Sequence, residues 1–234
     1  MKYAFEPSPV VSVPVAGTEL LFPVRRIFCV GRNYAEHARE MGAVDQASGL
    51  EPPFFFMKPA DALIAGAGEL SVTYPPQTAD LHHEVELVVA LAGGGANLAA
   101  RAANELIYGY AVGVDLTRRD MQARAKLKSH PWDMSKGFDQ SAILGEIHLA
   151  SQVGHPERGP IQLRVNGQLK QDGDLVAMMW RVPNIIANLS TLVRLAPGDL
   201  IYTGTPAGVG SLQVGDRILG EIVGVGQLRA TIVA

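Results

Sequence analysis

Three carboxylates are the residues of this sequence with the clearest chemical potential. Glu84 and Glu86 stand two positions apart in the segment HHEVELVVAL, and Asp115 ends the apolar run GYAVGVD. Because side chains alternate between the two faces of a strand, both glutamates would leave the same face. Asp115 would lie where a buried strand opens into a loop. Carboxylates that converge in this way repel one another unless protons or a cation neutralise them.

A metal ion is the cation that we predict for this triad. An isolated Glu-x-Glu pair usually marks solvent-facing acids, but here the opposite face is aliphatic and the glutamates' own face continues into Val88. The strand is therefore expected to be buried on both sides, where unpaired carboxylates are costly. Oxygen ligands favour Mg²⁺, with Mn²⁺ or Ca²⁺ possible. His82 shares the face, and as a fourth ligand it would favour a transition metal instead.

A histidine and a glutamate form the second candidate group. His37 and Glu40 are three residues apart in GRNYAEHAREMG, so on a helix they share a face and can form a hydrogen bond. A carboxylate beside an imidazole raises its basicity and orients its ring, as a general base for water requires. Such pairs are also common on surface helices without any catalytic role, and the sequence leaves both interpretations open.

Several cationic and polar residues could bind an anionic substrate. Arg119 and Gln122 lie one turn apart just after Asp115, and they suit a ligand with carboxylate and carbonyl oxygens. Lys136, in the polar loop SHPWDMSKGFDQS, could stabilise an oxyanion. Lys58, at the end of FFFMKP, is a similar candidate. For each of these residues a solvated surface role is the alternative.

The segment TGTPAGVG, residues 203–210, is a glycine-rich turn. Such turns can present backbone N–H groups such as that of Gly204 to anions, and Thr205 could add a hydroxyl donor at the mouth of a site. The segment lacks the GK[ST] ending of a phosphate loop, and no helix is expected after it, so a nucleotide role is not expected. An ordinary tight turn is the alternative.

The elements that would position these residues are mostly strands. Strands are expected at 27–31, 52–59, 81–91 and before Asp115, and Asn166-Gly167 predicts a hairpin with a type I′ turn. Helices are expected after Asn33 and after Thr117 as N-caps, over residues 96–110, and at Pro183. This pattern favours an α+β, predominantly β fold over an alternating βαβ sheet. Residues 1–20 are expected to be an N-terminal arm or edge strands, and residues 21–234 one catalytic domain.

Composition and charge exclude several classes of partner. The 234 residues are 18% charged with a net charge of −3, which provides no basic field for nucleic acid or anionic lipid. No apolar run approaches the roughly 20 residues that a membrane span needs. The first residues lack the apolar core of a secretion signal. The single cysteine, Cys29, is expected to be a buried small hydrophobe. A cytoplasmic protein is expected.

In their order along the chain, these segments resemble the fumarylacetoacetate hydrolase family. The resemblance rests on GRNYAEHAREMG, FFFMKP, HHEVELVV, GYAVGVDLTRRDMQ, PWDMSKGFD and LIYTGTPAGVG, and it runs from about Phe22 to the C-terminus. Within the family the chain is most similar to the bacterial acylpyruvate hydrolases, including those that act on fumarylpyruvate. The resemblance implies a mixed β-roll with short flanking helices and a homodimer.

The resemblance also implies roles for the candidate residues. The family's metal ligands fall on Glu84, Glu86 and Asp115, its catalytic dyad on His37 and Glu40, and its oxyanion lysine on Lys136. Its substrate contacts fall on Arg119, Gln122 and the loop with Gly204 and Thr205. Apart from the resemblance, Lys58 or Arg32 is expected to meet a distal carboxylate of the substrate. The implied reaction is metal-dependent cleavage of the C–C bond of a 2,4-dioxo acid. The best candidate is fumarylpyruvate, in the gentisate pathway of aromatic compound degradation, giving fumarate and pyruvate.

Three alternatives remain at this point. The same metal could stabilise an enolate formed by decarboxylation of oxaloacetate or by tautomerisation of a 2-oxo acid. A non-catalytic protein could use the pocket to bind a dicarboxylate. A structural Ca²⁺ site in a partner-binding β domain is the third alternative, and metal exchange followed by a turnover assay would separate it from an enzyme.

Overall fold

The largest sheet among the described residues has eight strands, and the carboxylate triad lies at one end of two neighbouring strands near its middle. The computed structural model describes residues 2–42 and 51–234. The order of the sheet is β4-β3-β15-β8-β9-β11-β5, with β12 also paired to β9. Its strands are β3 (Arg26–Val30), β4 (Phe55–Lys58), β5 (Leu63–Ala65), β8 (Val85–Leu91), β9 (Ile107–Asp115), β11 (Ala142–Leu144), β12 (His148–Leu149) and β15 (Asp199–Tyr202).

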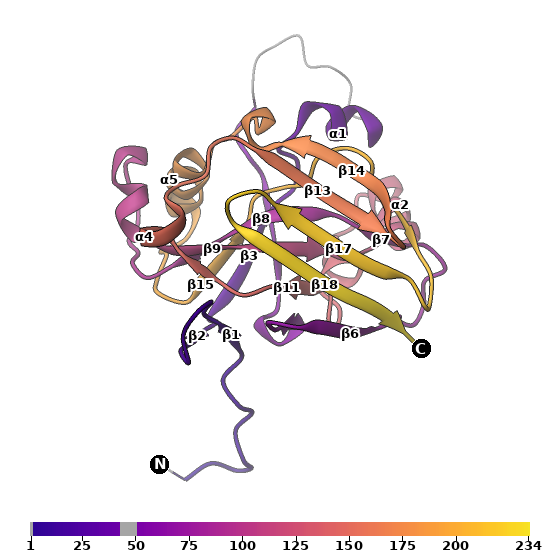
Figure 1. Cartoon of the computed structure of the whole chain (residues 1–234), viewed down its shortest axis with the longest axis horizontal. Helices are drawn as coiled ribbons and strands as arrows, with labels where there is room; N and C mark the ends of the chain where they lie inside the picture. Colours follow the sequence, from indigo (N-terminus) through magenta and orange to yellow (C-terminus); the bar gives the residue numbers. More distant parts are fainter. Residues whose placement is uncertain (1, 43–50) are drawn as a thin grey trace.

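A second sheet of five strands covers one face of the first, and it is seen in front of β8 and β9 in Figure 1. Its order is β14-β13-β17-β18-β6. Its strands are β6 (Glu69–Thr73), β13 (Pro160–Val165), β14 (Gln168–Asp174), β17 (Arg217–Ile222) and β18 (Gly226–Val233). The hairpin between β13 and β14 turns at Asn166 and Gly167, which both have positive φ angles (52° and 79°). The predicted type I′ turn is therefore confirmed.

Strand β8 is buried along its whole length, because apolar cores lie on both of its faces. Leu87 and Val89 pack toward the five-stranded sheet in the larger core, whereas Val88 and Ala90 belong to a second core with Cys29 and the N-terminal strands. The interpretation of this strand as buried on both sides is confirmed. An acidic residue on such a strand needs a partner inside the protein, since water cannot reach it.

Short helices and two small sheets complete the fold. The α-helices are α1 (Ala35–Glu40), α2 (Arg119–Leu127), α3 (Asp133–Lys136), α4 (Ala150–Val153) and α5 (Val182–Leu192), and the 3₁₀ helices are η1 (Ala60–Ala62), η2 (Ala100–Leu106) and η3 (Leu175–Ala177). The small sheets are β10-β7-β16, formed by Thr117–Arg118, Leu81–His83 and Gly210–Leu212, and β1-β2, formed by Ser12–Pro14 and Leu21–Pro23. This strand-rich architecture agrees with the expected fold class.

The expected extents of one strand and one helix are wrong. The single strand expected over residues 81–91 is two strands in different sheets, β7 and β8, with Glu84 between them. At the break the Val85 N–H donates to the side-chain oxygen of Gln171, at 3.0 Å, in place of a neighbouring strand. The helix expected over residues 96–110 is only the 3₁₀ helix η2, and β9 already begins at Ile107.

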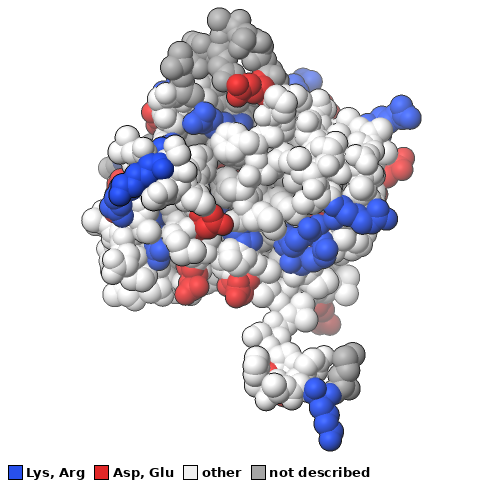
Figure 2. Space-filling view, turned by 180° about the vertical axis from the view of Figure 1, so that it is seen from behind, with Lys and Arg blue, Asp and Glu red and all other residues white. Residues whose placement is uncertain are grey.

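The N-terminal residues extend away from the body of the protein (Figures 1 and 2). Val13 and Val15 are buried in the second core, but Tyr3, Phe5 and Val10 are exposed. On the face shown in Figure 2, basic and acidic side chains are interspersed, as the small net charge predicts. The longest described helix, α5, has 11 residues, and no helix in residues 2–42 and 51–234 has the length and apolarity to cross a bilayer.

Candidate active site

The acidic triad is assembled by the pairing of β8 with β9. In that antiparallel pair Val85 lies opposite Val114, so Glu84 lies opposite Asp115, and the Asp115 N–H donates to the Glu84 carbonyl at 2.9 Å. One carboxylate oxygen from each of Glu84, Glu86 and Asp115 lies within 4.8 Å of the others. All three residues are at most 5% exposed. The three oxygens are close enough to share one divalent cation, whose Mg–O bonds are about 2.1 Å long.

The three carboxylates differ in how their charge is compensated. Burial alone would raise the pKa of Glu84, but Lys136 and Arg119 outweigh it and hold that pKa well below its ordinary value. For Glu86, burial and the charges of Asp115 and Glu84 raise the pKa well above its ordinary value. The only hydrogen bond to its carboxylate from the described residues comes from the Gly204 N–H, at 2.6 Å. The three carboxylates therefore have the arrangement and the chemistry to bind a further cation beside Glu86.

Lys136 lies inside the triad. Its Nζ donates to Glu84 Oε2 at 2.8 Å, to Asp115 Oδ2 at 2.7 Å and to Thr117 Oγ1 at 2.6 Å. Burial lowers the pKa of Lys136, but Asp115 and Glu84 outweigh that effect and raise it. Lys136 is therefore a cation at neutral pH that lies between Glu84 and Asp115. The prediction of Thr117 as a helix N-cap is wrong, because its hydroxyl bonds to Lys136 and to Glu84 and α2 begins two residues later.

Lys58 does not lie where a distal part of a substrate could reach it. Its side chain is fully buried, and its Nζ is 2.7 Å from Asp115 Oδ1. It also donates to the backbone carbonyls of Leu116 and Lys136. The suggestion that Lys58 meets a distal carboxylate is wrong, because the end of β4 enters the core beneath the triad. Removing one partner of such a buried pair costs about 3–5 kcal/mol, so Lys58 supports Asp115 structurally.

The predicted dyad is present on α1. His37 Nδ1 is 3.1 Å from Glu40 Oε2, and His37 is 5% exposed. Burial lowers the pKa of His37 from 6.5, and Glu84 and Glu40 oppose this effect only in part. Glu40 also accepts from the Gly208 N–H, which ties the helix to the glycine-rich loop. His37 is thus a mainly neutral imidazole near pH 7, held in orientation by a carboxylate.

The loop that begins at Thr203 closes the site behind Glu86. Gly204 has a φ of +96°, and a Cβ there would lie 2.7 Å from the Asn33 Cβ, so both backbone conformation and space require glycine. Asn33 was expected to be a helix N-cap, but this is wrong. Its amide nitrogen donates to the carbonyls of Trp180 and Thr203, and its oxygen accepts from the Trp180 N–H. Asn33 therefore fixes the loop that supplies the hydrogen bond to Glu86.

Thr205 belongs to a buried network that the sequence did not reveal. Its hydroxyl accepts from Gln171 Nε2 at 2.8 Å, and Gln171 Oε1 lies 2.9 Å from His83 Nδ1. Gln171 is fully buried, although its neighbours in QLKQDG are exposed. Such a polar hairpin strand provides no sequence signal that one of its residues supports the start of β8.

Helix α2 presents a polar face to the site. Arg119 donates to the carboxylate of Glu84 and, at 2.6 Å, to Gln122 Oε1. Gln122 is buried, and Arg119 is mostly so. The cleft in front of the triad is lined by Gly31, Arg32, His37, Met41, Glu84, Arg119, Gln122, Lys126, Trp132 and Lys136. The structure thus brings six of the twelve predicted site residues to the lining of one cleft, and it adds Lys126 and Trp132.

Lys126 could have been found from spacing alone. It lies four residues after Gln122 and seven after Arg119, so all three share one face of α2.

His82, the alternative fourth ligand, is not part of the acidic cluster. Its Nε2 is 2.9 Å from Asp80 Oδ1 instead.

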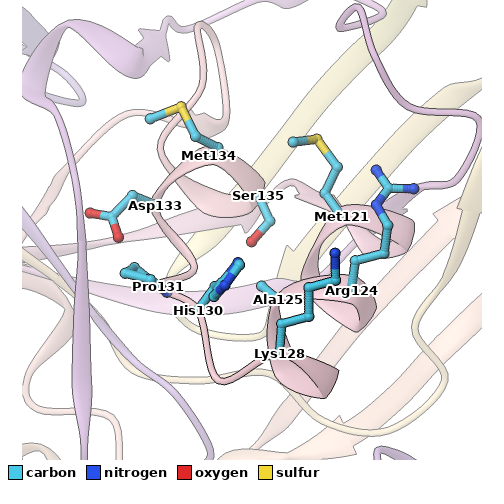
Figure 3. Close-up of a pocket in the computed structure, with 9 residues that line it drawn as sticks. All are labelled: Met121, Arg124, Ala125, Lys128, His130, Pro131, Asp133, Met134 and Ser135. Atoms are coloured by element: carbon cyan, nitrogen blue, oxygen red, sulfur yellow. The ribbon is translucent and has the colours of Figure 1, made fainter.

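A larger pocket of about 570 Å³ lies on the other side of α2, against α3 (Figure 3). The side chains of Arg124, Lys128, His130 and Asp133 surround it. It contains none of the predicted site residues, and it shows which cations of α2 point away from the triad. Arg124 and Lys128 are therefore suitable positions for control substitutions.

Comparison with known proteins agrees with this geometry. A family model for the fumarylacetoacetate (FAA) hydrolase C-terminal domain matches residues 26–233. A fumarylpyruvate hydrolase from Ralstonia sp is 43% identical over 183 residues, which are 78% of this chain and 94% of that protein. The mitochondrial oxaloacetate tautomerase of Mus musculus is 38% identical over 205 residues, 88% of this chain and 90% of its own.

One similar crystal structure contains a bound metal. Fumarylpyruvate hydrolase from Pseudomonas aeruginosa, solved in complex with Mn²⁺ and pyruvate, superimposes with a TM-score of 0.95 at 46% identity over 99% of both chains. The expected resemblance is confirmed in sequence and in fold. The chain belongs to the fumarylacetoacetate hydrolase family.

Proposed function

We propose that this protein is a metal-dependent hydrolase that cleaves the C–C bond of a 2,4-dioxo acid, with fumarylpyruvate as the substrate and fumarate and pyruvate as the products. The observation that carries the proposal is the buried triad within 4.8 Å, together with His37, which is paired with Glu40 and lines the same cleft as Glu84. The hydrolases of Ralstonia and Pseudomonas aeruginosa support this substrate. A purely binding protein would not need a neutral histidine oriented beside the metal ligands.

Glu84, Glu86 and Asp115 would hold the metal. A divalent ion supplies Lewis acidity toward the carboxylate and 2-oxo group of the substrate, which is worth several kcal/mol for the enolate that departs. We propose Mg²⁺ as the ion, because all three donors are carboxylates. The Mn²⁺ in the Pseudomonas aeruginosa structure is compatible with the same donors, and Ca²⁺ remains an alternative.

The other residues of the site each have a role in the proposed reaction. His37, oriented by Glu40, takes a proton from water, and the water oxygen forms a bond to C4 of the substrate. Lys136 stabilises the negative charge on the C4 oxygen. The C4 oxyanion then re-forms a carbonyl as the C3–C4 bond breaks, and the electron pair of that bond passes to the pyruvate enolate. The proton that His37 took from water is transferred to C3, which completes pyruvate and returns His37 to its neutral form. Arg119 and Gln122 hold the pyruvyl end, and Gly204 and Thr205 complete that side of the site.

The pH dependence of turnover follows from His37. Because burial lowers the pKa of His37 from 6.5, kcat/KM is expected to rise with pH through an apparent pKa below 6.5 and to be level above it. Glu40→Gln removes a carboxylate that raises the pKa of His37, so this acid limb is expected to move to lower pH. The plateau should fall roughly tenfold, a part of the 10²–10⁴ that a general base contributes.

The measurement is kcat/KM against pH at saturating metal. Glu36→Gln, an exposed acid on the same helix, is the matched control and should reproduce the wild-type profile. An acid limb that stays in place or moves to higher pH in Glu40→Gln would show that His37 is not the group that titrates.

Substrate turnover tests the proposal directly. The purified protein with Mg²⁺ or Mn²⁺ is expected to hydrolyse fumarylpyruvate and acetylpyruvate, and to act on oxaloacetate at least about tenfold more slowly. Ketone hydrolysis requires water activation, whereas decarboxylation does not, so the dyad favours hydrolysis over decarboxylation. The similarity to the oxaloacetate tautomerase of Mus musculus supports tautomerisation of oxaloacetate as the second candidate function. Faster turnover of oxaloacetate than of either acylpyruvate would establish that candidate instead.

We also propose a cytoplasmic homodimer that acts in the gentisate pathway. The exposed apolar side chains of the N-terminal arm, including Tyr3 and Phe5, support a second copy as their partner. Light scattering of the purified protein would test the dimer. Adjacent genes for gentisate ring cleavage and for maleylpyruvate isomerisation would support the pathway.

A further inference from the structure

Two cations in the cleft have no carboxylate partner in the described structure. Arg119 and Lys136 are both paired with Glu84. Lys126 and Arg32 line the same cleft, but no acidic oxygen of residues 2–42 and 51–234 lies within 4.0 Å of either side-chain charge. Excess positive charge in a cleft attracts an anion.

Aromatic rings hold these two cations in place. The Nζ of Lys126 lies over the Trp132 ring, 5.4 Å from its centroid, and the guanidinium of Arg32 lies 5.8 Å from the centroid of the Phe54 ring. Phe54 and Trp132 pack edge to face with centroids 5.7 Å apart. The rings thus form one continuous support beneath both charges. A cation held on an aromatic face loses little freedom when it binds a ligand.

The position of Lys126 on α2 separates it from the metal end of the cleft. Arg119 is at the first turn of the helix and bonds to Glu84, whereas Lys126 is in the last turn, about 10 Å along the helix axis at 1.5 Å per residue. Lys126 is half-buried, and burial together with the charges of Arg119 and Arg32 lowers its pKa. An incoming carboxylate would relieve both effects.

We infer that Lys126 and Arg32 form a subsite for a carboxylate at the distal end of the acyl group, so that the cleft selects acylpyruvates with a second carboxylate. This inference rests on the proposed function, because it assumes that the pyruvyl end is held at the metal triad. It assigns the contact with the distal carboxylate to Lys126 in place of Lys58, which is buried beneath Asp115. A substrate with one carboxylate, such as acetylpyruvate, leaves both cations without a partner.

The test compares kcat/KM for fumarylpyruvate and acetylpyruvate in Lys126→Met. A charge-assisted hydrogen bond predicts a fall of roughly 10- to 100-fold in the fumarylpyruvate-to-acetylpyruvate ratio. Lys126→Arg should keep the ratio within about threefold of wild type. Arg32→Met should lower the ratio in the same direction. Lys128→Met, on the same helix but at the pocket of Figure 3, is the matched control and should leave both rates unchanged.

The outcomes separate this subsite from the proposed function. Turnover of both substrates by the wild type, with an unchanged ratio in Lys126→Met, would overturn the subsite alone. Equal losses on both substrates would also overturn it, because Lys126 would then act only by supporting Arg119 and Gln122. If the wild type hydrolyses neither acylpyruvate under any metal, the proposed function fails and the subsite fails with it.

Discussion

Glu86→Gln is expected to abolish metal-dependent turnover while the protein stays folded. Glu86 is the carboxylate with the least compensation: burial, Asp115 and Glu84 all raise its pKa. An amide of the same shape removes the charge that a divalent cation would neutralise. The Gly204 N–H, which now donates to Glu86 Oε2, would keep an acceptor in the side-chain oxygen of glutamine. A loss of about 4 kcal/mol of transition-state stabilisation corresponds to a ~10³-fold lower kcat.

Two readouts distinguish loss of metal from loss of structure. Without metal, the thermal midpoint of Glu86→Gln should equal or exceed that of wild type, because the substitution removes repulsion between buried like charges. With metal at 100 times its Kd, wild type should gain about 2.7 kcal/mol of stability, whereas the variant should gain almost none. Glu221→Gln, an exposed acid on β17, is the control. Full activity of Glu86→Gln after chelation and dialysis would refute the triad.

The triad could be predicted from sequence because its geometry is local. Strand alternation places Glu84 and Glu86 on one face whatever the rest of the fold, and the pairing of β8 with β9 then brings Asp115 to them. The break of the strand at Glu84 did not alter this result. It moved β7 to another sheet, but the side chain of Glu84 kept its position beside Asp115.

Residues whose role depends on distant contacts could not be assigned in this way. Lys58 ends an aromatic segment and Lys136 stands in a polar loop, but neither context shows that Lys58 lies beneath Asp115 or that Lys136 lies between Asp115 and Glu84. Asn33 and Thr117 are of residue types that often cap helix N-termini, but their side chains form hydrogen bonds with residues distant in the sequence instead. Gln171 reaches the site from the second sheet, 88 residues after His83. Only the packing of the two sheets reveals such pairs.

His37→Ala is expected to lower kcat for fumarylpyruvate by about 10²–10⁴-fold without loss of metal binding. His37 contributes no ligand to the acidic cluster, so the metal-dependent gain in thermal stability should persist. Its loss removes the neutral base that Glu40 orients, which is the group that activates water in the proposed reaction. Because His37 is buried, His37→Gln is a second variant that fills more of the space and should lose activity to the same extent.

The same variant distinguishes hydrolysis from decarboxylation at one metal site. Loss of CO₂ from oxaloacetate needs a cation for the enolate but no activated water, so residual oxaloacetate turnover by His37→Ala should fall far less than fumarylpyruvate hydrolysis. Added imidazole should restore part of the hydrolysis, since it can enter the space that the side chain leaves. His130→Ala, an exposed histidine at the pocket of Figure 3, is the control. Equal hydrolysis rates in His37→Ala and wild type would remove the dyad from the mechanism and leave the metal with Lys136 as the whole catalytic apparatus.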